Sequence, residues 1–205
     1  MIIDISPLLS SDTAVWPGDT PLSRHVLCDI LKDSHLDLSS LTSTVHLGAH
    51  ADAPRHYSKQ GNTIDKVDLN SYLGPCYVHS VVGVSSINPG HLNELDLSKI
   101  ERILFRTLSQ TDSSVFNTDF TSIAPETIEL LGLHKVKLIG IDTQSIDPFD
   151  SKTLSAHKSL EVYKIANIEG LVLTEVKDGF YEFIGLPLKL EGFDGSPIRA
   201  VLRSL

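Results

Sequence analysis

The chain of 205 residues carries 17 basic and 26 acidic side chains, giving a formal net charge of −9, and 41% of its residues are apolar. This length and apolar fraction suit one globular domain with its own core and exclude intrinsic disorder. No apolar run is long enough to span a bilayer, the amino terminus does not read as a signal peptide, and no basic cluster is present. We therefore expect a cytoplasmic protein with no membrane and no nucleic-acid partner.

The apolar runs are short and rich in β-branched residues, a pattern that predicts strands. The predicted strands, in chain order, are 2–5, 76–84, 103–107, 136–141, 168–176, 181–190 and 198–202. Helices are predicted at 92–100, at 125–131 after Pro125, and at 155–163. Strands separated by a few helices predict a single compact α/β domain, residues 1–205, with a mixed β-sheet.

Two polar segments, 58–70 and 109–121, are predicted to be long loops. Loops of this length inside a domain are usually functional or disordered. The second places Phe116 and Phe120 among serine, threonine, aspartate and asparagine residues. It is either a flap whose aromatic side chains cover a pocket or a mobile surface excursion, and the sequence favours the excursion.

Three histidines and an aspartate, His46, His50, Asp52 and His56, fall within eleven residues. Imidazole and carboxylate groups are the ligands that zinc, manganese and iron accept. On a straight strand His46 and His50 would lie roughly 13 Å apart, at ~3.3 Å per residue, which is too far for one metal ion. A helical turn or a bend at Gly48 would bring them together, and we expect a bent segment.

Two further ligand-type residues lie far along the chain. Glu169 opens an apolar run, where an unpaired carboxylate would be costly to bury. His157 lies in the predicted helix at 155–163 and, taken alone, would be an exposed helix residue. The residues alone leave open whether this pair joins the first cluster.

The segment from His46 to His56 resembles the signature His-x-Gly-Thr-His-x-Asp-x-Pro-x-His of the metal-dependent cyclase family. It departs from the signature at Ala49, where threonine is commoner. Further blocks resemble the branch of bacterial kynurenine formamidases within that family. These blocks are 4–6, 16–19, 140–143, 145–148, 186–189, 194–195 and 199–201.

The resemblance implies a fold of the swivelling β/β/α type, a homodimer, and a two-metal centre. The implied reaction is hydrolysis of N-formyl-L-kynurenine to L-kynurenine and formate in tryptophan degradation. By the same resemblance, His46, His50 and Asp52 bind a first divalent ion. Asp52 bridges to a second ion, completed by His157 and Glu169. Zinc is the expected metal, with manganese as the alternative.

Two more roles follow from the resemblance. His56 corresponds to the family's catalytic histidine, and Trp16 to a residue that packs on the aryl ring of the small-molecule substrate. Two other functions remain open at this stage: a related hydrolase acting on another amide or a cyclic imide such as isatin, and a non-catalytic metal- or ligand-binding module. A passive binder has no need of His56, which argues against the module.

The remaining polar residues receive structural interpretations. Asp142 and Asp147 are expected to stabilise a turn or hold pocket backbone, and Arg199 to pair with an acid. Cys28 and Cys76 do not form a disulfide framework and are expected to be reduced and buried.

Overall fold

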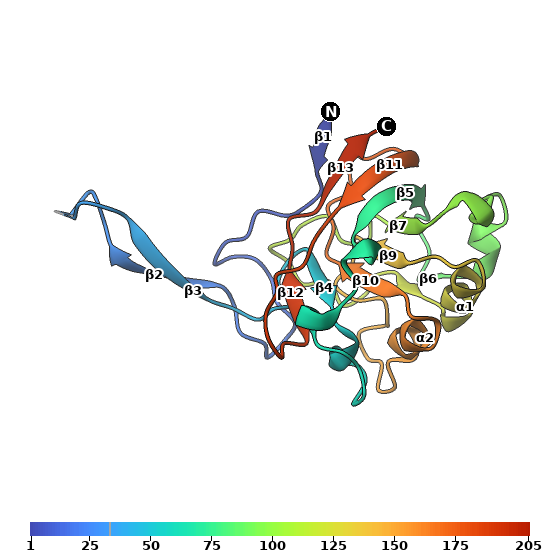
Figure 1. Ribbon diagram of the computed structural model, residues 1–205, viewed down its shortest axis with the longest axis horizontal. Helices are drawn as coiled ribbons and strands as arrows, with labels where there is room; N and C mark the ends of the chain where they lie inside the picture. The colour runs from blue at the N-terminus through green and yellow to red at the C-terminus, as the bar shows by residue number, and fades with distance from the viewer. Residues whose placement is uncertain (33) are drawn as a thin grey trace.

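The apolar runs assemble into one mixed sheet of nine strands in the computed structural model, which describes residues 1–32 and 34–205 (Figure 1). In sheet order, the strands are β1 (Ile2–Asp4), β13 (Val201–Ser204), β11 (Gly179–Ile184), β5 (Leu73–Ser80), β7 (Arg102–Arg106), β9 (Leu138–Ile141), β10 (Ala166–Glu169), β4 (His50–Asp52) and β12 (Gly195–Pro197). The four central strands β5, β7, β9 and β10 run parallel, and the flanking pairs are antiparallel. The expected α/β architecture with a mixed sheet is confirmed.

Two helices, α1 (Pro125–Leu133) and α2 (Ser155–Tyr163), cover one face of this sheet (Figure 1). Successive residues of a strand point to opposite faces, so each central strand contributes to two cores. In β7, Ile103 and Phe105 belong to the core that includes the helices, whereas Leu104 belongs to the core on the other face. The sheet is therefore buried on both sides at its centre, as parallel strands require.

Each predicted strand overlaps an observed strand of the main sheet, with shifted bounds, and the predicted helices at 125–131 and 155–163 are confirmed as α1 and α2. The predicted strand at 168–176 ends at Glu169, because Gly170 adopts a φ of +68° and turns the chain. The predicted helix at 92–100 is wrong: two 3-10 turns, Pro89–Leu92 and Leu97–Lys99, take its place. Asn88 caps the first turn and Ser98 bonds to Asp96 in the second, and such local side-chain bonds compete with an α-helix.

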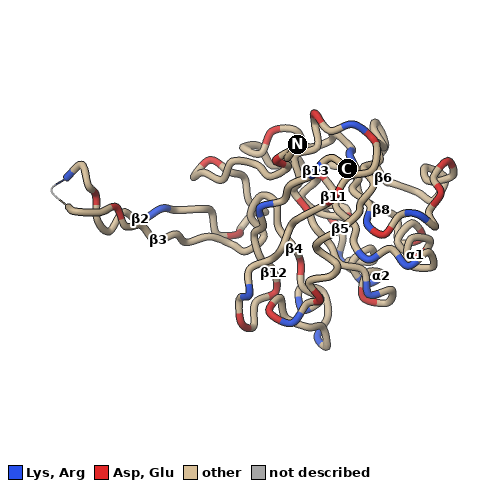
Figure 2. The backbone as a smooth tube through the Cα atoms, turned by 45° about the horizontal axis from the view of Figure 1, so that its top comes forward, with Lys and Arg blue, Asp and Glu red and all other residues tan. Residues whose placement is uncertain are grey.

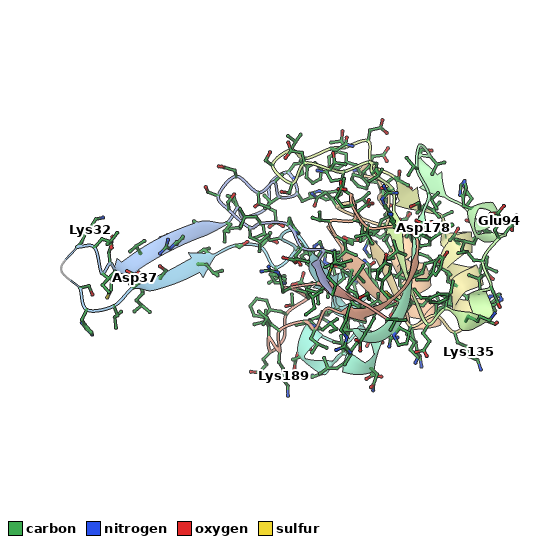
Figure 3. All side chains as sticks on the ribbon, turned by 90° about the horizontal axis from the view of Figure 1, so that it is seen from above. Lys32, Asp37, Glu94, Lys135, Asp178 and Lys189 are labelled. Carbon is green, nitrogen blue, oxygen red and sulfur yellow. The ribbon has the colours of Figure 1, made fainter. Side chains whose placement is uncertain are left out.

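Two small sheets complete the described structure. Strands β6 (Ser86–Ile87) and β8 (Ser122–Ile123) pair in parallel beside the main sheet. Strands β2 (Ser23–Cys28) and β3 (Leu38–Thr42) form an antiparallel hairpin that was not predicted. Figures 1 and 3 show this hairpin projecting far from the body of the molecule, with Lys32 and Asp37 near its tip. We call residues 23–42 the arm.

Charged residues are scattered along the chain and do not gather into a basic stripe in the part that the structure describes (Figure 2). None of the described helices has the length and hydropathy needed to cross a bilayer.

Candidate metal centre

The pairing of β4 with β10 places four polar side chains close together. His50 and Asp52 lie two residues apart on β4, so their side chains share a face. Strand β10 pairs with β4 so that Glu169 lies opposite His50 and Asn167 lies opposite Asp52. All four residues are buried. The two distant motifs of the sequence therefore meet through strand pairing.

Two glycines allow the segment before β4 to approach the end of β10. Gly48 has a φ of +56° and forms the bend that the sequence predicts between His46 and His50. A Cβ atom on Gly170 would collide with the backbone carbonyl of Gly48. The bend brings the rings of His46 and His50 to a centroid distance of 5.1 Å, a separation that a straight strand could not produce.

Asp52 lies at the centre of the cluster, and its two carboxylate oxygens differ. Oδ2 accepts a hydrogen bond from Asn167 Nδ2 at 3.0 Å and lies 3.3 Å from His157 Nε2. Oδ1 is buried and receives no hydrogen bond, although His46 Nδ1 lies 2.9 Å away and His50 Nε2 lies 3.5 Å away. A buried anionic oxygen is rarely left without a partner. Imidazole nitrogens around an unpartnered carboxylate oxygen fit a divalent metal ion.

Hydrogen bonds outside the cluster fix the orientation of two imidazole rings. His50 Nδ1 donates to the carbonyl oxygen of Gly48 at 2.9 Å, and its Nε2 lies 3.4 Å from Glu169 Oε2. His157 Nδ1 donates to Asp147 Oδ2 at 2.7 Å, and its Nε2 faces Asp52 and Glu169. Such bonds set the tautomer of metal-binding histidines. In both rings Nε2 is left available as the ligand atom.

Two sets of three side chains have ligand atoms close enough to bind one ion: His50, Asp52 and Glu169, and His46, Asp52 and His56. His157 lies beside the first set through its contacts with Asp52 and Glu169. The structure thus brings together all five predicted ligands and His56. Asp52 belongs to both sets.

Sequence reasoning missed Asp194, whose Oδ2 accepts from His46 Nε2 at 3.0 Å and from His56 Nδ1 at 3.3 Å. The rings of His46 and His56 lie 4.2 Å apart between their centroids. Asp194 precedes β12, the edge strand that pairs with β4. Its only signal in the sequence was its place in a block that resembles the cyclase family, because neither charge nor spacing distinguishes it.

The charges within the cluster reinforce one another. Burial raises the pKa of Asp52, but contacts with His157 and His46 outweigh this and hold the pKa well below its ordinary value. The pKa of Glu169 is also lowered, since His157 and His50 outweigh burial and the repulsion by Asp52. Burial lowers the pKa of His46, yet the carboxylates of Asp52 and Asp194 raise it to about 9. Without metal, His46 is therefore protonated at neutral pH.

The protonation of His46 predicts that a rise in pH lowers the thermal stability of the metal-free protein and increases the stabilisation by a bound metal. His46 has an ordinary pKa near 6.5 and a folded pKa of about 9, so its stabilising contribution is complete below 6.5 and is lost as the pH rises through 9. Metal binding requires neutral imidazole and is favoured by the same rise. We expect the Tm of the metal-free protein to fall between pH 6.5 and 9, while the increase in Tm caused by zinc grows. Thermal unfolding with EDTA or zinc measures both, and a rising metal-free Tm would contradict the assignment.

A cavity of about 440 Å³ opens onto this cluster. His46, His50, His56, His157 and Glu169 are part of its lining. Trp16, which is 36% exposed, lines the cavity together with Gly18, Asp19, Gln144, Ser145 and Leu154. The cavity therefore has an ionic wall and an aromatic wall.

Trp16 supplies the aromatic wall, and phenylalanines from two other segments of the chain pack against it. The ring of Trp16 lies 5.1 Å from that of Phe149 and 5.2 Å, edge-on, from that of Phe116, between centroids. Phe120 also contacts Trp16, at 6.5 Å. Two aromatic side chains of the loop at 109–121 therefore pack against Trp16, although no residue of that loop lines the cavity. A flap that covers the cavity stays a prediction.

The other polar residues have structural partners. Asp147 is more than a turn residue, because it also accepts hydrogen bonds from the backbone of Ala156 and His157 at the start of α2. Asp142 accepts four hydrogen bonds from the backbone and side chain of Thr107 and the backbone of Leu108. Arg199 pairs with Asp4, as expected. Cys76 is buried, whereas Cys28 is only half-buried on the arm.

The sequence profile of the cyclase family, described as "Putative cyclase", matches residues 3–148. This match includes the cluster from His46 to His56 but ends before His157 and Glu169. The fold is similar to that of a potential metal-dependent hydrolase with cyclase activity, with a TM-score of 0.85, 27% identity, and coverage of 98% of this chain and 96% of the other.

A predicted metal-dependent hydrolase from Bacillus stearothermophilus is similar at a TM-score of 0.84 and 26% identity, covering 98% and 97% of the two chains. Isatin hydrolase A from Labrenzia aggregata is similar at a TM-score of 0.82 and 20% identity, covering 98% and 93%. At 20% identity, the similarity to isatin hydrolase A shows a shared fold only.

Proposed function

The chain belongs to the cyclase family, and from this premise we propose that it is a metal-dependent arylformamidase. It hydrolyses N-formyl-L-kynurenine to L-kynurenine and formate, a step of tryptophan degradation. One observation carries the proposal: a single cavity joins a buried cluster of imidazole and carboxylate ligands to an aromatic wall formed by Trp16. An N-aryl formamide presents both of the groups that such a cavity would bind, a polar amide and a flat ring.

Two divalent ions would be held by the residues of the cluster. His46, His50 and Asp52 would bind one ion, and Asp52, His157 and Glu169 the other. The unpartnered Oδ1 of Asp52 and the neighbouring imidazole nitrogens support this assignment. Nitrogen and oxygen donors of this kind suit zinc, and also manganese. When bound, such ions acidify a water molecule and polarise a carbonyl oxygen.

His56 is proposed as the acid–base residue. Its Nδ1 is within hydrogen-bonding distance of Asp194 Oδ2, at 3.3 Å, and its side chain is 34% exposed at the cavity. A proton held on Nδ1 by Asp194 leaves Nε2 as the base. Nε2 can take a proton from the attacking water and deliver it to the aniline nitrogen as the C–N bond breaks. An aniline anion is a poor leaving group, so this proton transfer matters for the reaction.

Trp16 is proposed to pack on the aryl ring of the substrate. An offset-stacked aromatic pair contributes ~0.5–1.5 kcal/mol beyond area burial. We therefore expect Trp16→Ala to raise KM about 2- to 13-fold with little change in kcat. Trp16→Phe is the matched variant and should restore part of the affinity. Steady-state kinetics and a thermal melt of both variants check this: lost stability with unchanged KM would make Trp16 a core residue.

A cyclic amide such as isatin is the second candidate substrate. Its scissile bond also joins a carbonyl carbon to an aryl nitrogen, and a fused ring would meet the same aromatic wall. The residues of the cavity do not distinguish a formyl group from a ring carbonyl. The non-catalytic alternative is disfavoured, because a passive binder would not need a histidine beside the ligands and open to the cavity.

One experiment separates these candidates. Zinc-loaded protein is incubated with N-formyl-L-kynurenine, isatin and plain formanilide, and kcat/KM is compared. We expect the highest value for N-formyl-L-kynurenine. A higher value for isatin would assign the cyclic substrate, and no turnover of any of the three would reject the arylformamidase. We also propose that the protein works in the cytoplasm as a homodimer.

A further inference from the structure

The turn from Trp16 to Asp19 holds two side chains of different chemistry on the wall of the cavity. Asp19 N donates to the carbonyl oxygen of Trp16 at 2.9 Å, which closes a four-residue turn. Pro17 has a φ fixed by its ring, and Gly18 adopts a φ of +94°, a value that residues with a side chain rarely reach. Both Trp16 and Asp19 line the cavity. This restricted turn therefore presents an aromatic ring and a carboxylate to the same ligand.

Hydrogen bonds on both sides tie the turn to the walls of the cavity. Thr44 N donates to the carbonyl oxygen of Thr20 at 2.9 Å, and Thr44 lies two residues before the proposed metal ligand His46. On the other side of the turn, Ala14 N donates to the carbonyl oxygen of Ser113 at 2.8 Å. The fold therefore sets the position of the turn relative to the metal ligands, and a substrate bound at those ligands meets the carboxylate in a defined place.

Among the described residues that line the cavity, Asp19 is the one charged residue outside the group of proposed metal ligands and His56. It is exposed and forms no ion pair with a described residue. Its Oδ1 accepts from the backbone N–H of Thr20 at 2.8 Å, a bond that an uncharged amide oxygen could accept equally well. No lysine or arginine of the described chain lines the cavity. The charge of Asp19 is therefore available to a cationic group of a ligand.

An amino-acid substrate carries such a group. In N-formyl-L-kynurenine, a short flexible chain joins the α-ammonium group to the aryl ring, so the cation can reach a carboxylate beside the ring of Trp16. An ammonium group is repelled by divalent ions at the metal ligands and attracted by Asp19. Both effects favour one orientation of the substrate, with the formyl group at the metal ligands and the cation at the turn.

We propose that Asp19 binds the α-ammonium group of the substrate and makes the enzyme selective for aryl formamides with a cationic side chain. The inference rests on the arylformamidase proposed above and names the residue that recognises the amino-acid part of its substrate. Isatin has no cation, so the same contact favours the amino-acid substrate over isatin. The contact exists before and during the chemical step, and such uniform binding lowers KM without changing kcat.

The test combines a variant with a substrate analogue. Asp19→Asn removes the charge but keeps an oxygen that accepts from Thr20 N, so the turn is preserved. The deamino analogue of N-formyl-L-kynurenine has hydrogen in place of the ammonium group. With zinc-loaded wild type, we expect the KM of the analogue to be at least about 10-fold higher than that of N-formyl-L-kynurenine, with similar kcat. With Asp19→Asn, the two KM values should agree within about 2-fold.

Asp12→Asn is the matched control. Asp12 is also an exposed carboxylate near the amino terminus, but it does not line the cavity. This variant should keep the selectivity of the wild type. An equal effect of Asp19→Asn on both substrates would give Asp19 a structural role, and no effect on either would leave it without a role in binding. Either result would overturn the proposal.

Binding is measured without turnover through the fluorescence of Trp16, the only tryptophan of the chain. L-Kynurenine and its deamino analogue are titrated into the wild type and Asp19→Asn, and quenching gives each Kd. We expect the wild type to bind L-kynurenine at least about 10-fold more tightly than the analogue, and the variant to lose this difference. This result without hydrolysis of any formamide would reject the arylformamidase and keep the ammonium site. Hydrolysis with no dependence on Asp19 would overturn the ammonium site alone.

Discussion

Asp52→Asn is expected to abolish metal binding and reduce hydrolysis to background. Both proposed ligand sets share this carboxylate, and its Oδ1 has no other partner. The amide preserves the shape of the side chain but removes its charge and replaces one oxygen by a hydrogen-bond donor. His46 and His157 would also lose their buried counter-ion. Removing one member of a buried ion pair costs ~3 kcal/mol or more, so the metal-free variant should unfold at a lower temperature than the metal-free wild type.

Elemental analysis under saturating zinc measures the first effect. We expect close to two ions per wild-type chain and fewer than one per Asp52→Asn chain. Asp142→Asn is the matched control, because Asp142 is also a buried carboxylate but receives all its hydrogen bonds from Thr107 and Leu108. It should retain both ions. If Asp52→Asn also retained both, Asp52 would not be the shared ligand.

The part of this site that follows from the sequence is local. The bend at Gly48 could be predicted, because four ligand-type residues separated by small residues need a turn to converge. Helix α2 could be predicted from its periodicity, and with it the position of His157. The resemblance to the cyclase family connected this cluster to Glu169, whereas the residues alone left the connection open.

The rest depends on strand pairing, which no local pattern encodes. Strand β4 consists of His50, Ala51 and Asp52 and lies next to the edge strand β12, so its polar composition hides it from a search for apolar runs. Local patterns are expected to fail at functional sites for this reason. Asn167 and Asp194 reach the cluster only through the neighbours of β4, namely β10 and the residue before β12. Their roles could not be predicted from spacing.

The arm escaped prediction for a different reason. Strands are recognised by the alternation of apolar and polar residues that burial of one face produces. Both strands of the arm are largely exposed in the single chain. Because neither strand buries one face against the core, its sequence does not need alternating apolar and polar residues. Apolar residues such as Leu31 and Leu41 therefore lie outside both cores of the single chain.

His56→Ala is expected to separate catalysis from metal binding within the cluster. His56 follows Pro54 in a 3-10 turn directly after β4, and its ring lies beside His46 at the mouth of the cavity. It is more exposed than the proposed ligands of the cluster, and its Nδ1 lies 3.3 Å from Asp194 Oδ2. A group placed in this way can exchange protons with water and substrate. We therefore expect the variant to keep both ions and its fold, yet to lose ~10²–10⁴-fold in kcat, the usual contribution of a positioned acid–base residue.

Two further variants make this result specific. His134→Ala removes an exposed histidine at the end of α1 and should leave kcat unchanged. Asp194→Asn keeps His56 but removes the acceptor that holds its Nδ1 proton, so we expect an intermediate loss, about 10- to 100-fold, as for other residues that orient a metal-site histidine. The pH–rate profile of the wild type should show an ionisation that His56→Ala lacks. Ligand atoms of His46, Asp52 and His56 lie within 4.8 Å of one another, close enough to bind one ion, so ligation by His56 is the competing assignment. If His56→Ala loses zinc as readily as His46→Ala does, then His56 is a ligand, and the proton must be carried by another group.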